Sequence, residues 1–162
     1  MASYFHHLRS AVVALYLLLG FVVPASAEVT FATGKLTIVT AKGEAREFDV
    51  EWAVNMQQRA RGLMQREQLD DNAGMIFDFG ESRMVTMWMA DTPLSLDMVF
   101  INETGRIVRV AERTTPFSEA IIGSGEPVRY VLEVKGGRAA ELGIAAGDRL
   151  SLPLAVPDGP QP

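Results

Sequence analysis

Apolar and polar side chains alternate along residues 47–54, and this pattern constrains the fold more than any other feature of the chain. Three of the four positions between the apolar residues are acidic. The apolar positions are Phe48, Val50, Trp52 and Val54. Because successive side chains of a β-strand point to opposite faces, a period of two predicts a strand with one buried face. Residues 128–135 show the same period and predict a second such strand.

Further short apolar runs, separated by Gly, Pro and Asp/Asn turns, extend this β-rich pattern along the chain. We expect further strands at 35–40, 74–79, 84–90, 96–101, 106–110 and 150–154. The turns at 41–44 and 102–105 then join two hairpins. The long stretch 113–127 has no periodicity and is interpreted as a surface loop.

Helical spacing is confined to two short segments. Apolar residues recur at helical intervals in 56–64, and Asn55 stands where an N-cap is expected. Residues 138–142 predict a second helix of one or two turns, ended by Gly143. The sequence therefore predicts a mainly β fold, a compact antiparallel sandwich or partly open barrel with one or two short helices.

The chain of 162 residues is expected to form one domain over residues 28–156, followed by a flexible Pro- and Gly-rich tail at 157–162. Residues 1–27 have the pattern of a secretory signal peptide: Arg9, a thirteen-residue apolar run, and Ala-Ser-Ala before position 28. We expect cleavage after Ala27, export to the periplasm or the medium, and no retained membrane anchor. The apolar run is shorter than the ~20 residues that span a bilayer.

Composition excludes several classes of chemistry. The chain has no cysteine, and its two histidines, at positions 6 and 7, would leave with the signal peptide. The mature protein would then lack the residues of Ser-His-Asp and Cys-His catalysis and of zinc sites, so we expect no cofactor and no metal. The formal net charge of −5 argues against a nucleic-acid partner, because nucleic-acid binding surfaces are normally basic.

Two carboxylates stand in apolar runs, Asp97 and Glu133. Such a pair could hydrolyse a glycoside without histidine, which makes a carboxylate-dependent hydrolase one alternative. The period of the 128–135 strand, however, places Glu133 on the same side as Arg129 and Lys135, a side expected to face solvent. Asp97 could instead form a structural ion pair with Arg59 or Arg66.

Methionines suggest a second alternative. Thioethers are suitable ligands for Cu(I), and the run 84–89 contains three of them, Met84, Met87 and Met89. In a strand only Met87 and Met89 would share a face, so filling of the core is the competing interpretation.

Several motifs in the same order make residues 50–150 resemble the family known as domain of unknown function 192. The motifs are Arg59 with 61–66 (Arg-Gly-Leu-Met-Gln-Arg), 74–77 (Gly-Met-Ile-Phe), Trp88-Met89, 96–100 (Leu-Asp-Met-Val-Phe), Gly105, 130–133 (Tyr-Val-Leu-Glu) and Gly136-Gly137. The resemblance implies a compact β-rich sandwich or barrel and no particular activity. Gln65 and Asp91 depart from the family pattern, which would affect the ligand if the surrounding segment lines a pocket.

These observations lead to the hypothesis of a non-enzymatic, exported binding or accessory module with a small cleft near residues 88–97. Its ligand would be a small molecule, a glycan or a peptide. The residues proposed to bind it are Arg59, Arg66, Trp88, Met89, Asp91, Asp97 and Glu133.

Overall fold

The computed structural model describes residues 28–154, and its main element is one sheet of seven strands. The predicted signal peptide and the tail at 157–162 lie outside the described residues. The strands of this sheet are β1 (Ala32–Val39), β2 (Ala45–Ala53), β3 (Ala73–Arg83), β5 (Leu96–Ile101), β6 (Ile107–Ala111), β8 (Val128–Lys135) and β9 (Arg149–Leu150). A separate pair, β4 (Thr86–Met87) and β7 (Ile122–Gly123), forms a small second sheet. The helices are α1 (Met56–Arg61) and α2 (Arg138–Leu142).

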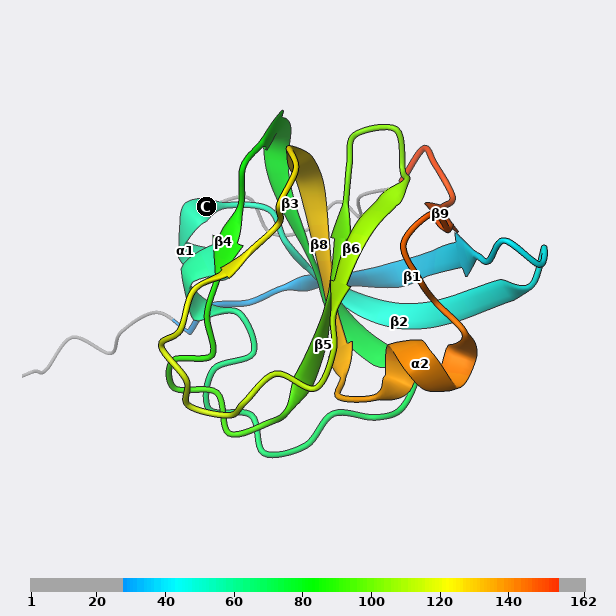
Figure 1. The fold of residues 1–162 in the computed structure, drawn as a ribbon. Coiled ribbons are helices and arrows are strands. Elements are labelled where there is room, and N and C mark those ends of the chain that lie inside the picture. The colour runs from blue at the N-terminus through cyan, green and yellow to red at the C-terminus, as the bar shows by residue number, and fades with distance from the viewer. Residues whose placement is uncertain (1–27, 155–162) are drawn as a thin grey trace, which may run out of the picture.

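The large sheet curls until its two edges nearly meet (Figure 1). Its order is β6-β5-β8-β3-β2-β1-β9, and a bridge between Arg106 and Arg149 links the outermost strands. The Leu150 amide donates to the Gly105 carbonyl at 2.7 Å, which continues the contact. The expectation of a mainly β, barrel-like fold with short helices is therefore confirmed.

One strand pair departs from the expected antiparallel arrangement. β2 and β3 are parallel, with Val50 opposite Gly74, whereas the other neighbours in the sheet are antiparallel. Parallel neighbours need a crossover rather than a tight turn. The connection at 54–72, which contains α1, supplies this crossover.

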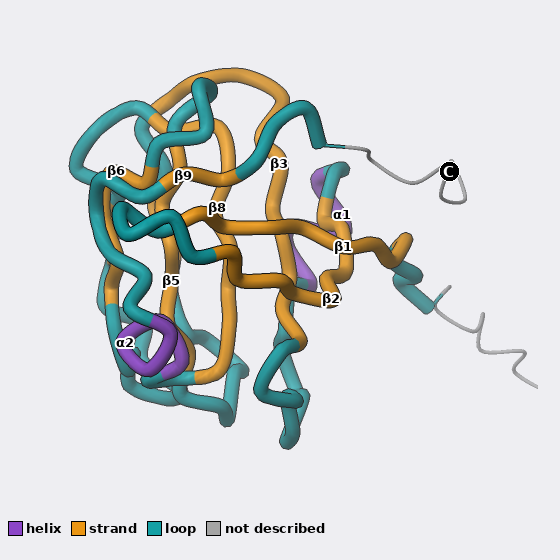
Figure 2. The backbone as a smooth tube through the Cα atoms, turned by 90° about the vertical axis from the view of Figure 1, so that its right-hand side faces the viewer, coloured by secondary structure: helices purple, strands orange, loops and turns teal. Residues whose placement is uncertain are grey.

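Apolar residues form two cores, one on each face of the central strands. The barrel interior holds the large side chains Phe48, Trp52, Ile76, Val99 and Leu132, among others. A second core lies on the outer face of β3, β5 and β8 and contains Leu63, Met75, Phe77, Met89, Met98 and Phe100, among others. The turn after α1 and the β4 and β7 segments contribute to this outer core, and α1 and α2 lie at opposite ends of the molecule (Figure 2). The central strands are thus buried on both faces.

The short helix α1 begins at the predicted residue. The Asn55 side chain accepts a hydrogen bond from the Gln58 amide at 2.8 Å, and Gln58 Oε1 accepts from the Asn55 amide at 3.3 Å. This reciprocal pair is a capping box. The helix ends earlier than the expected residue 64, because Gly62 takes a φ of 47° that leaves the helical region.

Three strand expectations need correction. The run 84–90 forms only the two-residue strand β4, and the run 150–154 contributes only Leu150 to β9. Val54 follows the end of β2 and is 42% exposed rather than buried. The loop at 113–127 is irregular as expected, apart from β7.

No helix within residues 28–154 is long and apolar enough to span a membrane.

Candidate functional site

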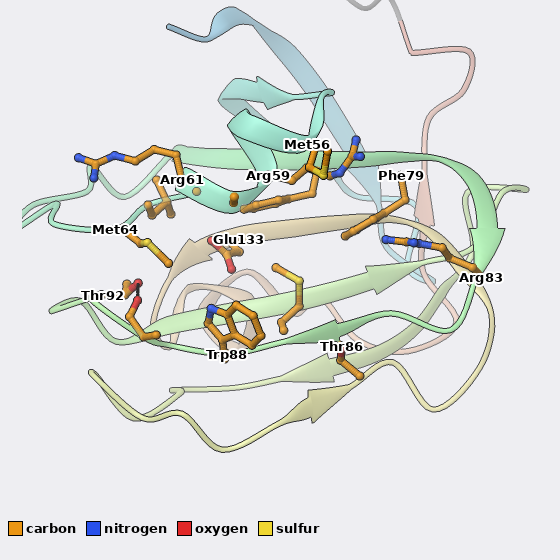
Figure 3. Close-up of a pocket in the computed structure, with 16 residues that line it drawn as sticks. Met56, Arg59, Arg61, Met64, Phe79, Arg83, Thr86, Trp88, Thr92 and Glu133 are labelled. Atoms are coloured by element: carbon orange, nitrogen blue, oxygen red, sulfur yellow. Dashed lines mark hydrogen bonds between the residues drawn. The ribbon is translucent and has the colours of Figure 1, made fainter. Parts of the chain in front are cut away.

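A cavity of about 380 Å³ lies between α1 with its following turn, β3 and the β4 segment (Figure 3). We call it the Glu133 cavity. It is lined by Met56, Arg59, Ala60, Arg61, Gly62, Leu63, Met64, Phe77, Phe79, Arg83, Thr86, Met87, Trp88, Ala90, Thr92 and Glu133. Most of these side chains are apolar, and Glu133 is the only carboxylate among them.

Glu133 comes from the middle of β8 and points to the outer face of the sheet. The strand register places it between Met75 of β3 and Met98 of β5. Glu133 is only 4% exposed, because the outer core covers this face. The expectation that Glu133 faces solvent was therefore wrong: the alternation was read correctly, but both faces of β8 are covered.

The Glu133 carboxyl has no ionic or hydrogen-bonding support from residues 28–154. Burial alone raises its pKa from an ordinary 4.5 to about 8. A carboxyl beside a guanidinium would instead show a lowered pKa. Figure 3 shows the carboxyl pointing toward the space between Met64 and Trp88. Glu133 is thus a buried, ionisable group that faces the cavity and has no hydrogen-bonding partner among residues 28–154.

The opposite part of the cavity carries two arginines around one aromatic ring. The guanidinium carbons of Arg59 and Arg83 lie 5.5 and 4.8 Å from the centre of the Phe79 ring. Arg59 Nη1 donates to the carbonyls of Val54 at 2.7 Å and Asp78 at 2.9 Å. Burial, and next the charge of Arg83, lower the pKa of Arg59, and the charge of Asp78 opposes them only in part. We call these three residues, Arg59, Phe79 and Arg83, the arginine end.

The wall of the cavity opposite β3 is held by backbone contacts between distant segments. The Gln65 amide donates to the Asp91 carbonyl at 2.8 Å, and both residues have a positive φ, 62° and 53°. This contact fixes the Gly62-Leu63-Met64 turn beside the segment that carries Trp88. The two departures from the family pattern, Gln65 and Asp91, therefore join two walls of the cavity. Trp88 itself is 53% exposed and lies at the solvent side of the site.

Asp97 has a different environment. It is completely buried, and its Oδ1 accepts from the amides of Arg113 at 2.7 Å and Gly137 at 2.8 Å. Its Oδ2 accepts from the Ala139 amide at 2.8 Å, in the first turn of α2. The suggestion that Asp97 pairs with Arg59 or Arg66 was wrong. Its partners are three backbone amides, which join β5, the β6–β7 loop and the start of α2.

The remaining predicted residues also lie outside the cavity. Arg66 forms a bidentate pair with Glu51, at 2.7 and 2.5 Å. Met89 is buried in the outer core, with its sulfur 3.1 Å from the Thr114 hydroxyl oxygen. The side chain of Asp91 does not line the cavity and is exposed. Of the seven predicted residues, the structure brings together Arg59, Trp88 and Glu133.

The methionines of the 84–89 run have different surroundings. Met84 is exposed, Met87 lines the cavity, and Met89 is buried in the outer core, against which Met87 also packs. Within residues 28–154 no group of three or more His, Cys, Asp or Glu side chains could hold a metal ion.

Sequence reasoning missed several lining residues, including Met64, Phe77, Phe79, Arg83 and Thr86. A signal for two of them was present, because Met64 and Phe77 belong to motifs that carry the family resemblance. Phe79 and Arg83 lie outside those motifs: Phe79 is two residues after Phe77 on the same face of β3, and Arg83 follows a register irregularity in the pairing of β3 with β8.

Comparisons with known proteins place this arrangement among uncharacterised relatives. Residues 37–152 match the model of the DUF192 family, described as "Uncharacterized ACR". A crystal structure from Sinorhizobium meliloti 1021, described as that of a candidate transcription regulator, is 48% identical with a TM-score of 0.75. The match covers 76% of this chain and 96% of that one. A protein of unknown function from Novosphingobium aromaticivorans DSM 12444 is 32% identical with a TM-score of 0.71, covering 76% and 94% of the two chains. The search of curated proteins found no match.

Proposed function

Because the chain belongs to DUF192, an uncharacterised family, we propose a function from its own geometry: a non-enzymatic binding module that takes one small amphipathic organic molecule into the Glu133 cavity. The observation that carries this proposal is an unpartnered, buried carboxyl facing an apolar cavity. A bound molecule with a complementary group would supply the hydrogen-bond partner that this carboxyl lacks within residues 28–154.

The size and lining of the cavity support the same proposal. Its volume of about 380 Å³ lies within the range typical of small-molecule sites. Such sites combine mostly apolar walls with a few polar groups that orient the ligand. Here the polar groups are Glu133, the arginine end, Arg61, Thr86 and Thr92.

A binding role fits the site better than hydrolysis. Glycoside hydrolysis needs two carboxyl groups on either side of one bond. Glu133 and Asp97 point to opposite faces of the sheet, and both Asp97 oxygens are occupied by backbone amides. The cavity offers no second carboxylate among its lining residues.

The regulatory role described for the Sinorhizobium protein is not extended to this chain. Recognition of DNA requires a basic surface that neutralises phosphates, and the formal net charge here is −5. We keep the expectation that nucleic acid is not the partner.

A neutral apolar dye tests the proposed binding. N-phenyl-1-naphthylamine fluoresces in apolar sites, and we expect it to bind the mature protein with one site per chain. Ala60→Trp would fill the cavity from the exposed side of α1 and should abolish this binding. Ala146→Trp, at an exposed position outside the cavity lining, is the matched control and should bind normally. Equal dye binding by both variants, or none by the wild type, would refute the proposal.

We also propose that the module is exported, on the support of the sequence pattern of residues 1–27. Cell fractionation of the full chain, followed by N-terminal sequencing, should find a protein that begins at Glu28 outside the cytoplasm. Recovery of the intact chain from the cytoplasm would contradict export and leave the binding proposal unaffected.

A further inference from the structure

The two ends of the Glu133 cavity are chemically opposite. Resting on the binding function proposed above, we infer that the ligand is an elongated zwitterion with a terminal amine. Its ammonium group lies at Glu133, its apolar chain along the methionine and tryptophan walls, and its carboxylate at the arginine end.

A cationic group suits the Glu133 end. The carboxyl lacks a donor from residues 28–154, and no guanidinium is close enough to affect its ionisation. In a water-poor site an ammonium group would restore the ionised carboxylate and form a charge-assisted hydrogen bond. Trp88 and Phe77 line the same cavity, and aromatic faces attract organic cations.

An anionic group suits the arginine end. The guanidinium carbons of Arg59 and Arg83 both lie within 5.5 Å of the centre of the Phe79 ring, and the charge of Arg83 lowers the pKa of Arg59, an effect that Asp78 only partly opposes. Neither forms a salt bridge within residues 28–154, where the ion pairs of arginine involve Arg46, Arg66, Arg129 and Arg138. A carboxylate placed between two like charges would relieve their repulsion.

The wall between the two ends is apolar. Met64 and Met87 line it together with Trp88, and thioether side chains adapt readily to flexible methylene chains. Figure 3 shows Arg83 beside Phe79 and away from Glu133, so the two charged ends are separated. A molecule with charge at one end alone would leave the opposite end unpaired.

Calorimetric titration of the mature protein with ω-amino acids tests this inference. The probes are 4-aminobutanoate, 6-aminohexanoate and 8-aminooctanoate, compared with hexylamine, hexanoate and hexanol. We expect one ω-amino acid to bind at least about tenfold more tightly than hexylamine or hexanoate, a difference of about 1.4 kcal/mol.

Two variants assign the ends. Glu133→Gln should remove the preference for the amine, and Arg83→Gln should weaken the preference for the carboxylate. Glu103→Gln and Arg106→Gln change exposed residues in the β5–β6 turn, outside the cavity lining, and should leave all affinities unchanged. Dye binding by each variant shows that the cavity remains intact.

The possible outcomes separate the two proposals. If hexanol or hexanoate binds as tightly as every ω-amino acid, the cavity binds ligands but the zwitterion inference is refuted. The same conclusion follows if Glu133→Gln keeps the amine preference. If neither the dye nor any probe binds, both proposals fall.

Discussion

Asp97 and Glu133 lie on neighbouring strands and point to opposite faces of the sheet. In the β5–β8 register Asp97 is opposite Val134, and Met98 is opposite Glu133. The Asp97 carboxylate therefore accepts hydrogen bonds from backbone amides at one end of the barrel, whereas the Glu133 carboxyl lines the Glu133 cavity on the outer face. Two carboxylates with similar sequence surroundings thus have different environments: Asp97 accepts hydrogen bonds from backbone amides, and Glu133 faces the cavity.

Asp97→Asn should destabilise the fold by about 2–4 kcal/mol, because hydrogen bonds to a buried charged group are strong and are lost here without solvent access. The amide nitrogen of Asn would face at least one of the backbone donors that Asp97 accepts. Urea unfolding monitored by circular dichroism measures the change. Asp91→Asn, at an exposed position, is the control and should differ little from the wild type. An unchanged Asp97→Asn protein would contradict the structural role.

Glu133 should make stability depend on pH. Its folded pKa of about 8 lies above its unfolded value, so the folded protein holds this proton more tightly. The resulting stability is fully present below about pH 4.5 and is lost as the pH rises to about 8. The difference in free energy of unfolding between Glu133→Gln and the wild type should increase by roughly 3–5 kcal/mol, in favour of the variant, as the pH rises from about 5 to about 9. Urea unfolding of both proteins across this range gives the difference, and a constant difference would show that Glu133 is not desolvated.

Arg59→Gln should loosen α1. The substitution removes hydrogen bonds to the carbonyls of Val54, directly after β2, and of Asp78, in the middle of β3. We expect a loss of about 1 kcal/mol and faster hydrogen exchange of the α1 amides. Arg61→Gln removes a guanidinium whose one hydrogen bond within residues 28–154 goes to the exposed Gln65 side chain, and it should leave both unchanged. Equal exchange rates in the two variants would show that the Arg59 hydrogen bonds do not hold α1 in place.

Gly62→Ala should deform the cavity wall. Gly62 has φ 47° and ψ −140°, a region that other residues rarely adopt, and an added Cβ would lie 3.3 Å from Phe77 Cζ. We expect a loss of about 1–3 kcal/mol and weaker dye binding. Gly123→Ala adds a Cβ that meets nothing within 4 Å, and it should be tolerated. If both variants unfold at the same urea concentration, the strained turn does not shape the site.

The sequence by itself determined the local elements of this protein. Alternation predicted β2 and β8, and the cap at Asn55 predicted the start of α1, whereas its end at Arg61 came three residues before the predicted residue 64. These features depend on residues close together in the chain, whose backbone preferences act without knowledge of the rest of the fold. The motifs also placed Met64, Phe77, Trp88 and Glu133 within the family pattern.

Only the tertiary structure decided the environment of each side chain. Alternation shows that Glu133 and Lys135 share a face of β8, but the outer core, built from segments far away in the sequence, buries one and leaves the other exposed. The partners of Asp97 likewise come from residues 113 to 139, and backbone amides carry no sequence signal. The site therefore depends on the strand register and on the outer core, because long-range packing decides which side chains are buried and which charged groups lie next to each other.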